Sequence, residues 1–283
     1  MTSALKLLQG RFGRVALLDS DQDLVPHTHP QCHVLIKASG ADTSFHVRDR
    51  LHPLTAETLV LVNAWEPHSK VHRATHERST VLALYIEPEW LAGLDANLSV
   101  SGLGGFFPEP CARIPAYVRA LADRLVDEML GSSLDERDQA RWEIELFELM
   151  MSVIYEFSAW RDRMEIYRAS LGRLADPRIN RAIRFMKEHL DTGLSIDELA
   201  KVCGLSRPHF FHLFRGCTSV SPALYLNTLR MESAFGRLTG SDASISTLSD
   251  SLGFSEPQHF TRFFRQNLGI PPSEYRRRVE LFG

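Results

Sequence analysis

The sequence predicts an α+β protein of two domains, in which a small antiparallel barrel or sandwich precedes a helical region. Length is the first indication, because 283 residues exceed the roughly 100–200 of a typical single domain. The second is a change of hydrophobic period near Arg113, from short strand-like runs to helical spacing. The third is an internal duplication after Asp176, in a stretch that reads as short helices. With 44% apolar residues, the chain can bury a core in each domain.

Composition excludes several classes of protein. No stretch approaches the ~18–20 continuous apolar residues of a membrane span, so no membrane partner is expected. The N-terminus carries Lys6, Arg11 and Arg14 but no sustained apolar region before a small-residue cleavage site, so we expect a cytoplasmic protein. The cysteines lack CxxC spacing and fit reduced thiols in that compartment. They are Cys32, Cys111, Cys203 and Cys217.

Charge divides the chain into two parts. Residues 1–172 contain 17 Lys and Arg against 24 Asp and Glu, a balance of −7. Residues 173–283 contain 15 against 11, a balance of +4, and the two parts sum to the net charge of −3. Eight of the 12 histidines precede residue 80. The basic second part is able to attract a polyanion such as nucleic acid although the whole protein is nearly neutral.

Residues 1–112 are predicted to form the barrel. Short apolar runs alternate there with turn-rich segments, as in small antiparallel β proteins. The runs are Val15–Leu18, Val34–Ile36, Leu59–Val62 and Val81–Ile86.

Residues 113–172 are predicted to form a hairpin of two amphipathic helices that turns at Gly131-Ser132-Ser133. Two apolar stripes at helical spacing support this prediction. They comprise Ile114, Tyr117, Val118, Leu121, Leu125 and Met129, and then Trp142, Leu146, Leu149, Met150, Val153, Phe157, Trp160 and Met164. The hairpin is expected to serve as a dimer interface, although packing on the barrel explains the stripes equally well.

The third region, residues 173–283, contains the duplication. The segment Ser195–Ser206 aligns with Ser244–Ser255 at an offset of 49 residues. Further on the offset is 50, and the matched pairs are Phe210 and Phe260, Phe214 and Phe264, Arg215 and Arg265, Pro222 and Pro272, and Tyr225 and Tyr275. Two copies are too few for a solenoid, so the region is a tandem of one small unit.

Each copy has the local signals of a helix-turn-helix. In the first, Ser195 caps one helix, Gly204 ends it with positive φ, and Ser206 caps the next. A buried Leu205 anchors the turn. The equivalent residues of the second copy are Ser244, Gly253, Ser255 and Phe254. The two units span about 196–216 and 245–266, and this geometry presents the second helix to a DNA major groove. A single copy is also compatible with an ordinary helical hairpin, but two copies in the basic region favour DNA binding.

The outward faces of the second helices supply the expected DNA contacts. These are Arg207, His209, Phe211, His212 and Arg215 in the first unit, and Gln258, Thr261, Arg262 and Arg265 in the second. Gln pairs with adenine edges and Arg with guanine edges or phosphate, so the second unit is expected to contribute more to sequence-specific base recognition. Phe211 offers an apolar contact, whereas Glu256 and His259 are expected to be solvated.

A long helix over Ser221–Phe235, with Pro222 in its first turn, is predicted between the two units. A stiff connection fixes the distance between the reading helices. Because successive major-groove faces lie ~34 Å apart, one chain is able to read two adjacent grooves and a dimer four.

The region from Asp176 to Arg278 resembles the DNA-binding domain of the AraC/XylS family of bacterial transcription regulators. The matching segments are Asp176–Ile179, Leu199-Ala200, Gly204–Ser206, Phe214-Arg215, the helix between the units, Gly253–Arg265 and Gly269–Arg276. The resemblance implies promoter binding, and usually activation through RNA polymerase. One departure is Thr218-Ser219, which stands where the second copy has Leu268-Gly269, so the first unit is expected to be less regular.

Four histidines of the barrel are candidate effector ligands. His27, His29 and His33 share parity, so on an extended strand they would face one way, unless Pro30 kinks the strand. With His68 they resemble the metal motifs of cupin barrels, where His33 takes the place of an acidic residue. Imidazoles suit Zn²⁺, Ni²⁺, Fe²⁺ or Cu²⁺. Related regulators place an organic effector pocket there instead, and a structural role is the third alternative.

Two further histidines lie close to this group in the sequence, and two other functions compete with effector sensing. His72 and His76 lie in a polar stretch and are expected on the solvated surface. A cupin metalloenzyme fused to a DNA-binding tail is one rival function, but it lacks a carboxylate pair, since Glu57 and Glu66 are merely nearby. An architectural DNA-binding protein without a sensor is the other. The favoured interpretation is a one-component regulator, not an enzyme, controlled by a small molecule or metal.

Overall fold

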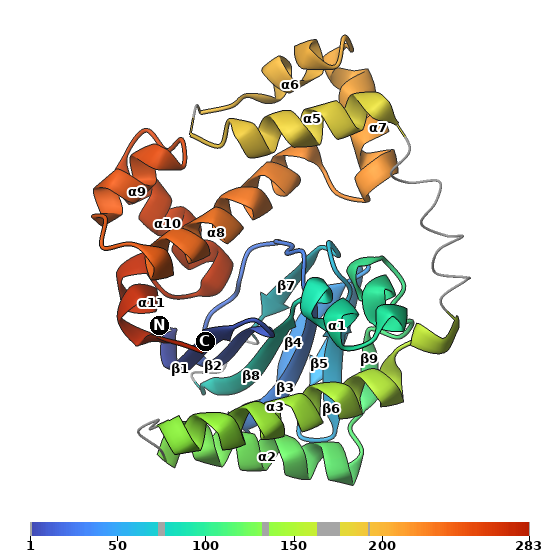
Figure 1. The fold of residues 1–283 in the computed structure, drawn as a ribbon, viewed down its shortest axis with the longest axis vertical. Coiled ribbons are helices and arrows are strands. Elements are labelled where there is room, and N and C mark those ends of the chain that lie inside the picture. The colour runs from blue at the N-terminus through green and yellow to red at the C-terminus, as the bar shows by residue number, and fades with distance from the viewer. Residues whose placement is uncertain (1, 73–76, 132–135, 163–175, 192, 283) are drawn as a thin grey trace.

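A computed structural model describes residues 2–72, 77–131, 136–162, 176–191 and 193–282. A β-rich half lies between a pair of helices on one side and the C-terminal helices on the other (Figure 1). Three sequence predictions fall outside the described residues. They concern His76, the Ser132-Ser133 turn, and the part of the helical hairpin beyond Asp162. Within the described residues, no helix has the length and apolar character to cross a bilayer.

The β-rich half contains two sheets. The larger has the strand order β10-β1-β2-β8-β3-β6-β9 and the smaller β5-β4-β7. The strands are β1 (Ser3–Gly10), β2 (Gly13–Ser20), β3 (Cys32–Gly40), β4 (Thr43–Val47), β5 (Arg50–Leu54), β6 (Thr58–Val62), β7 (His68–Val71), β8 (Ser79–Ile86), β9 (Cys111–Arg113) and β10 (Val279–Leu281). The four predicted runs lie in β2, β3, β6 and β8, which confirms them. Among the described strands, neighbours pair antiparallel except β1 and β10, which pair parallel.

Side chains of the large sheet alternate between two cores, as the period of two in a strand requires. Along β8, Leu82 and Leu84 face one core, whereas Ala83 and Tyr85 face the other. The helices α2 (Ala116–Gly131) and α3 (Glu136–Phe157) cover the first core. Most of the predicted stripe residues are buried there, so packing on the barrel accounts for them. Shorter helical segments around them are α1 (Pro88–Leu94), η1 (Ala96–Gly102) and η2 (Trp160–Asp162).

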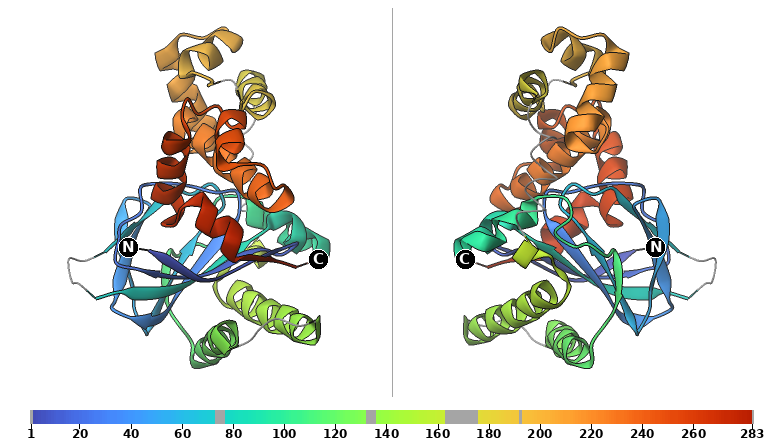
Figure 2. Two further views of the ribbon diagram at one scale, coloured as in Figure 1. Left: turned by 90° about the vertical axis from the view of Figure 1, so that its left-hand side faces the viewer. Right: turned by 90° about the vertical axis from the view of Figure 1, so that its right-hand side faces the viewer.

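The C-terminal region contains the two predicted helix-turn-helix units. Its helices are α5 (Pro177–Glu188), α6 (Ile196–Val202), α7 (Arg207–Thr218), α8 (Pro222–Gly240), α9 (Ile245–Ser251), α10 (Pro257–Leu268) and α11 (Pro272–Arg278). The connecting helix α8 is longer than predicted and begins with Pro222 after the cap Ser221, whose side chain accepts from the N–H of Leu224. Figure 2 shows these helices as a narrow column on the β-rich half.

The two units relate differently to the barrel. Phe210 and Phe214 of the first unit lie in a core of their own. Phe260 and Phe264 of the second lie in the core that also fills the barrel interior. The second unit therefore shares a core with the barrel, whereas the first has a core of its own, against which Trp65 of the barrel packs.

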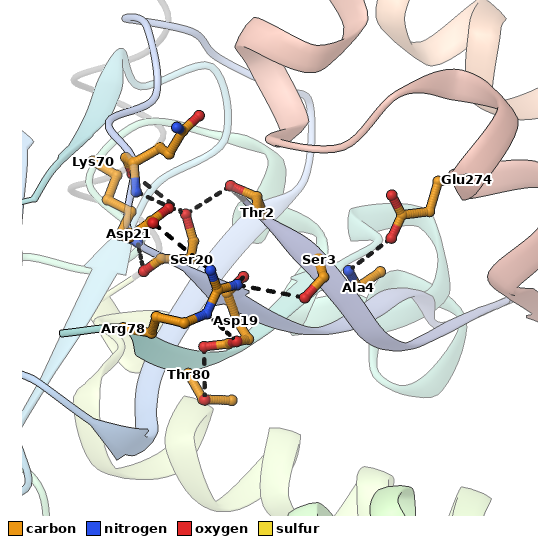
Figure 3. A network of polar contacts seen from close by, with 11 residues as sticks. Thr2, Ser3, Ala4, Asp19, Ser20, Asp21, Lys70, Arg78, Thr80 and Glu274 are labelled. Carbon is orange, nitrogen blue, oxygen red and sulfur yellow. Dashed lines mark hydrogen bonds and ion pairs between the residues drawn. The ribbon is translucent and has the colours of Figure 1, made fainter. Parts of the chain in front are cut away.

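The C-terminus strengthens this docking. The strand β10 extends the sheet beyond β1, and Tyr275 donates from its hydroxyl to Oε1 of Gln9 at 2.7 Å. Glu274 of α11 accepts a hydrogen bond from the N–H of Ala4 (Figure 3). The same network ties β2 to its neighbours through Arg78, which pairs with Asp19.

Candidate DNA interface and buried histidine cluster

The turns of both helix-turn-helix units form as the sequence predicts. Gly204 and Gly253 have φ of +66° and +74°, a region that glycine enters at little cost. Ser195 and Glu198 form a reciprocal capping box at the start of α6. Ser244 caps α9 as predicted, and its side chain accepts from the N–H of Thr247. Ser206 is the N-cap of α7 as predicted, but its side chain forms no capping hydrogen bond.

Two details of the predicted turns are wrong. The N-cap of α10 is Glu256 rather than Ser255, because Pro257 takes the first helical position that its fixed φ favours. Leu205 and Phe254, expected to be buried, are partly exposed and pack at the edge of their cores.

The predicted irregularity of the first unit is smaller than the sequence suggests. Ser219 adopts φ of +65° at the end of α7, the left-handed conformation that Gly269 has at the end of α10. A side chain in this conformation is strained, but the backbones of the two units end alike.

The predicted DNA contacts lie on the outer faces of α7 and α10. Exposed side chains are those of Arg207, His209, Phe211, His212 and Arg215 on α7, and of Gln258, Arg262 and Arg265 on α10. Two of the predicted residues have partners within the protein. Arg207 forms an exposed ion pair with Asp197 at 3.3 Å, and Thr261 is partly buried and donates to the carbonyl of Pro257. The other exposed donors and acceptors are accessible to a nucleic acid.

The four barrel histidines come together, but not along one strand. His27 and His29 lie before β3, which begins only at Cys32, and Pro30 separates them from it. His33 lies on β3, and His68 begins β7, where it forms a single bridge with His27. The expectation of a shared strand face is therefore wrong, because a bent loop gathers the side chains.

Three of these histidines converge on one point. One nitrogen from each of His29, His33 and His68 lies within 4.8 Å of the others, whereas His27 is outside this group. The three side chains are 2–4% exposed, so water has little access to them. Tyr85 stacks on His33 with ring centroids 4.1 Å apart and covers one side.

Hydrogen bonds set the tautomers of the cluster. Carbonyl oxygens only accept, so Nδ1 of His29 donates to Gln31 and Nδ1 of His68 to Glu66, at 2.9 and 3.0 Å. This leaves Nε2 of both rings without a proton. Nδ1 of His33 lies 3.1 Å from Nε2 of His29 and donates to it, so a metal ion that binds Nε2 of His29 must displace this hydrogen bond. Among the described residues, the buried Nε2 atoms of His33 and His68 have no partner.

Burial keeps these rings neutral. Desolvation first, and then the neighbouring histidines, lower the pKa of His29, His33 and His68 well below its ordinary value. The pKa of His27 is also lowered by burial. Neutral imidazoles with an available lone pair are the form that binds metal ions.

Comparison with known proteins identifies both halves. Residues 199–278 match the helix-turn-helix domain family, and residues 17–154 match the AraC-like ligand binding domain family. The chain belongs to the AraC family of transcription regulators. The prediction from the sequence is thereby confirmed, as is its two-part fold with a β-rich sensor and a helical double helix-turn-helix. Regulators of this family are not enzymes.

Relatives of this AraC-family chain differ in how much they share. The MmsAB operon regulatory protein of Pseudomonas aeruginosa is 34% identical over 34% of this chain, and the match spans 31% of that relative. The transcriptional activator RhaS of Shigella sonnei is 24% identical over 90% of this chain and 88% of its own. A crystal structure of an apo ToxT variant from Vibrio cholerae covers 99% of this chain and 97% of its own, with 10% identity and a TM-score of 0.54. That similarity concerns the fold.

In this regulator, α8 lies directly against the loops that carry the histidines. Its Thr228 donates to the carbonyl of Thr28, between His27 and His29, at 3.0 Å. The ring of Tyr225 stacks on that of Trp65, and the backbone N–H of Trp65 donates to the carbonyl of His29.

One turn further along α8, Glu232 accepts two hydrogen bonds from Arg14 at 3.1 and 3.2 Å, and one from Gln31. Tyr225, Thr228 and Glu232 are spaced as neighbours on one helix face. Sequence reasoning missed these residues, because their partners lie 160 to 218 positions away and a single sequence has no signal for such pairs.

Proposed function

We propose that this chain activates transcription from promoters that both helix-turn-helix units bind, under the control of a divalent transition metal held by His29, His33 and His68. The buried histidine cluster carries this proposal. The protein acts in the cytoplasm as a homodimer and engages RNA polymerase. The 24% identity to RhaS, which is named a transcriptional activator, supports activation rather than repression.

The cluster fits a metal ion better than the other effectors considered. Two buried Nε2 atoms lack partners, and an unsatisfied buried polar group costs about 1–3 kcal/mol, which a bound cation would offset. Backbone carbonyls fix the outer nitrogens of His29 and His68, as the second shell of metal sites does. The cavity beside His29 measures about 20 Å³, which is too small for an organic effector.

The histidine loops and α8 supply the link between the sensor and the DNA. A ligand shifts a conformational equilibrium only through different affinities for the two states. Reorientation of His29 moves the carbonyl that binds Trp65 and the segment that contacts Thr228 and Glu232. These contacts position α8, which sets the spacing of the two reading helices.

The proposed dimer uses the outer surface of α3. Its inward stripe is occupied by the barrel, but Ile144 and Phe147 are 67% and 41% exposed, and Leu94 of α1 is 46% exposed. They line a groove of about 940 Å³ with Trp90. Exposed apolar patches of this kind commonly mark association sites.

DNA selected from a random-sequence pool by the protein tests this function. Its affinity is measured by fluorescence anisotropy with chelator and with Zn²⁺, Ni²⁺ or Cu²⁺ added. We expect at least one metal to change the affinity about tenfold, the low end of typical coupling energies. The change disappears in His33→Ala and persists in His46→Ala, an exposed histidine on β4. Equal affinity under all conditions would exclude metal control, and no selected sequence would exclude specific DNA binding.

A further inference from the structure

A second cavity lies between the barrel and the first helix-turn-helix unit. It measures about 490 Å³, within the roughly 300–1,000 Å³ of small-molecule sites, which often lie at domain interfaces. Its walls come from the turn between β4 and β5, the loop between β6 and β7, the end of α7 and the start of α8. None of its lining residues belongs to the histidine cluster. The cavity is therefore distinct from the proposed metal site, although the backbones of Trp65 and Glu66 in its wall hydrogen-bond to His29 and His68.

An aromatic pair lines this cavity, with one ring from each domain. Trp65 of the barrel stacks on Tyr225 of α8 with ring centroids 4.3 Å apart and planes 5° from parallel. Trp65 has φ of +61°, a conformation in which a bulky residue is an outlier. Such strain costs about 1–3 kcal/mol and gathers at ligand sites. Because the inner faces of both rings contact each other and Tyr225 is only 8% exposed, the partly exposed indole of Trp65 is the apolar surface that the cavity offers. The structure holds this indole in place against a local cost.

The charged groups of the cavity leave one charge of each sign available. Arg48 pairs with Glu66 at 2.6 Å, and these two neutralise each other. Asp49 and Arg215 are exposed, and within the described part of the chain neither side chain makes an ion pair or hydrogen bond. Asp49 belongs to the barrel wall and Arg215 to the wall formed by α7.

We propose that this cavity binds an aromatic α-amino acid. The ammonium group pairs with Asp49, the carboxylate with Arg215, and the ring packs against the indole of Trp65. A zwitterion with a flat side chain matches both available charges and the indole, whereas a simple anion or cation leaves one charge unmatched. The ligand bridges the barrel and the first unit. It also occupies the guanidinium of Arg215, a predicted DNA contact, so ligand and DNA compete for it.

Binding of L-phenylalanine to the full-length protein, measured by calorimetry, tests the proposal. Two analogues each lack one charge: 2-phenylethylamine has no carboxylate and 3-phenylpropanoate no ammonium. We expect saturable binding of L-phenylalanine, and binding of each analogue weaker by about tenfold or more, the loss of one charged hydrogen bond. Asp49→Asn should weaken L-phenylalanine binding to the same extent and leave 3-phenylpropanoate unchanged. Arg215→Gln should weaken L-phenylalanine and leave 2-phenylethylamine unchanged.

Matched controls separate this site from the rest of the molecule. Asp242→Asn and Arg237→Gln change the same residue types at exposed positions near the far end of α8 and should bind L-phenylalanine as the unsubstituted protein does. Binding is measured with chelator present, so failure of the metal proposal does not affect this one. The inference is overturned if L-phenylalanine, L-tyrosine and L-tryptophan show no saturable binding up to about 10 mM. Equal affinity for the analogues, or for the Asp49 and Arg215 variants, would overturn it as well.

Discussion

The ion pair between Arg14 and Glu232 joins the barrel to α8, and its removal is predicted to loosen that helix. The two side chains are 11% and 24% exposed and share two hydrogen bonds. Each charged hydrogen bond contributes about 1.5–3 kcal/mol, and breaking a buried pair costs about 3–5 kcal/mol. Because the Glu232 side chain is still 24% exposed, we expect an interaction energy between Arg14 and Glu232 of about 2 kcal/mol, below the cost of a fully buried pair. This corresponds to a shift of about 30-fold between docked and released α8.

Native-state hydrogen exchange of the α8 amides measures this coupling in a double-mutant cycle of Arg14→Met and Glu232→Gln. Either substitution should lower the opening free energy of α8, and the second should add little to the first. Arg11→Met, at an exposed arginine on the turn between β1 and β2, should leave α8 unchanged. Effects of the two substitutions that add within about 0.5 kcal/mol, or α8 amides whose exchange protection is unchanged, would show that the ion pair does not hold α8 on the barrel.

Three further predictions concern the helix-turn-helix units. Arg262→Ala should cost about 1–3 kcal/mol of DNA affinity and relax the preference at one base position, whereas Arg265→Ala should lower the affinity for all DNA sequences equally. Selection on randomised sites checks both variants. A uniform loss of affinity from each would mean that both arginines contact phosphate. Phe264→Ala should destabilise the fold by about 3–5 kcal/mol in chemical denaturation, since the ring is fully buried, and a loss below 1 kcal/mol (on the order of a surface change) would contradict that packing. Ser219→Gly should raise stability by roughly 1 kcal/mol, because glycine relieves the positive φ, and a lower melting temperature would exclude strain there.

The helix-turn-helix units were predictable because their signals are local. Capping serines, the glycines of the turns and the buried phenylalanines lie within a few residues of the structures they determine. The main error in these units was Ser255, where the preference of Pro257 for the first helical position moved the cap by one residue.

The candidate histidines were predictable from the sequence, but not which of them converge or which elements bring them together. Parity on a strand suggested His27, His29 and His33 as a group, whereas the structure joins His29, His33 and His68 through a loop bent at Pro30. A loop has no period from which side-chain direction follows.

The docking of the second unit on the barrel was not predictable. It depends on β10 pairing with β1 and on α8 contacting the histidine loops, between residues 200 to 272 positions apart. A three-residue strand such as β10 has too little pattern to be recognised in a single sequence.

Metal binding by His29, His33 and His68 is tested by the metal content of the protein, which is purified without an affinity tag or chelator and measured by elemental mass spectrometry. We predict about one equivalent of a transition metal per chain, retained in His46→Ala and lost in His29→Ala, His33→Ala and His68→Ala. A metal-free protein that also fails to take up Zn²⁺, Ni²⁺, Fe²⁺ or Cu²⁺ on addition would contradict it. So would variants of the three histidines that bind metal as the unsubstituted chain does.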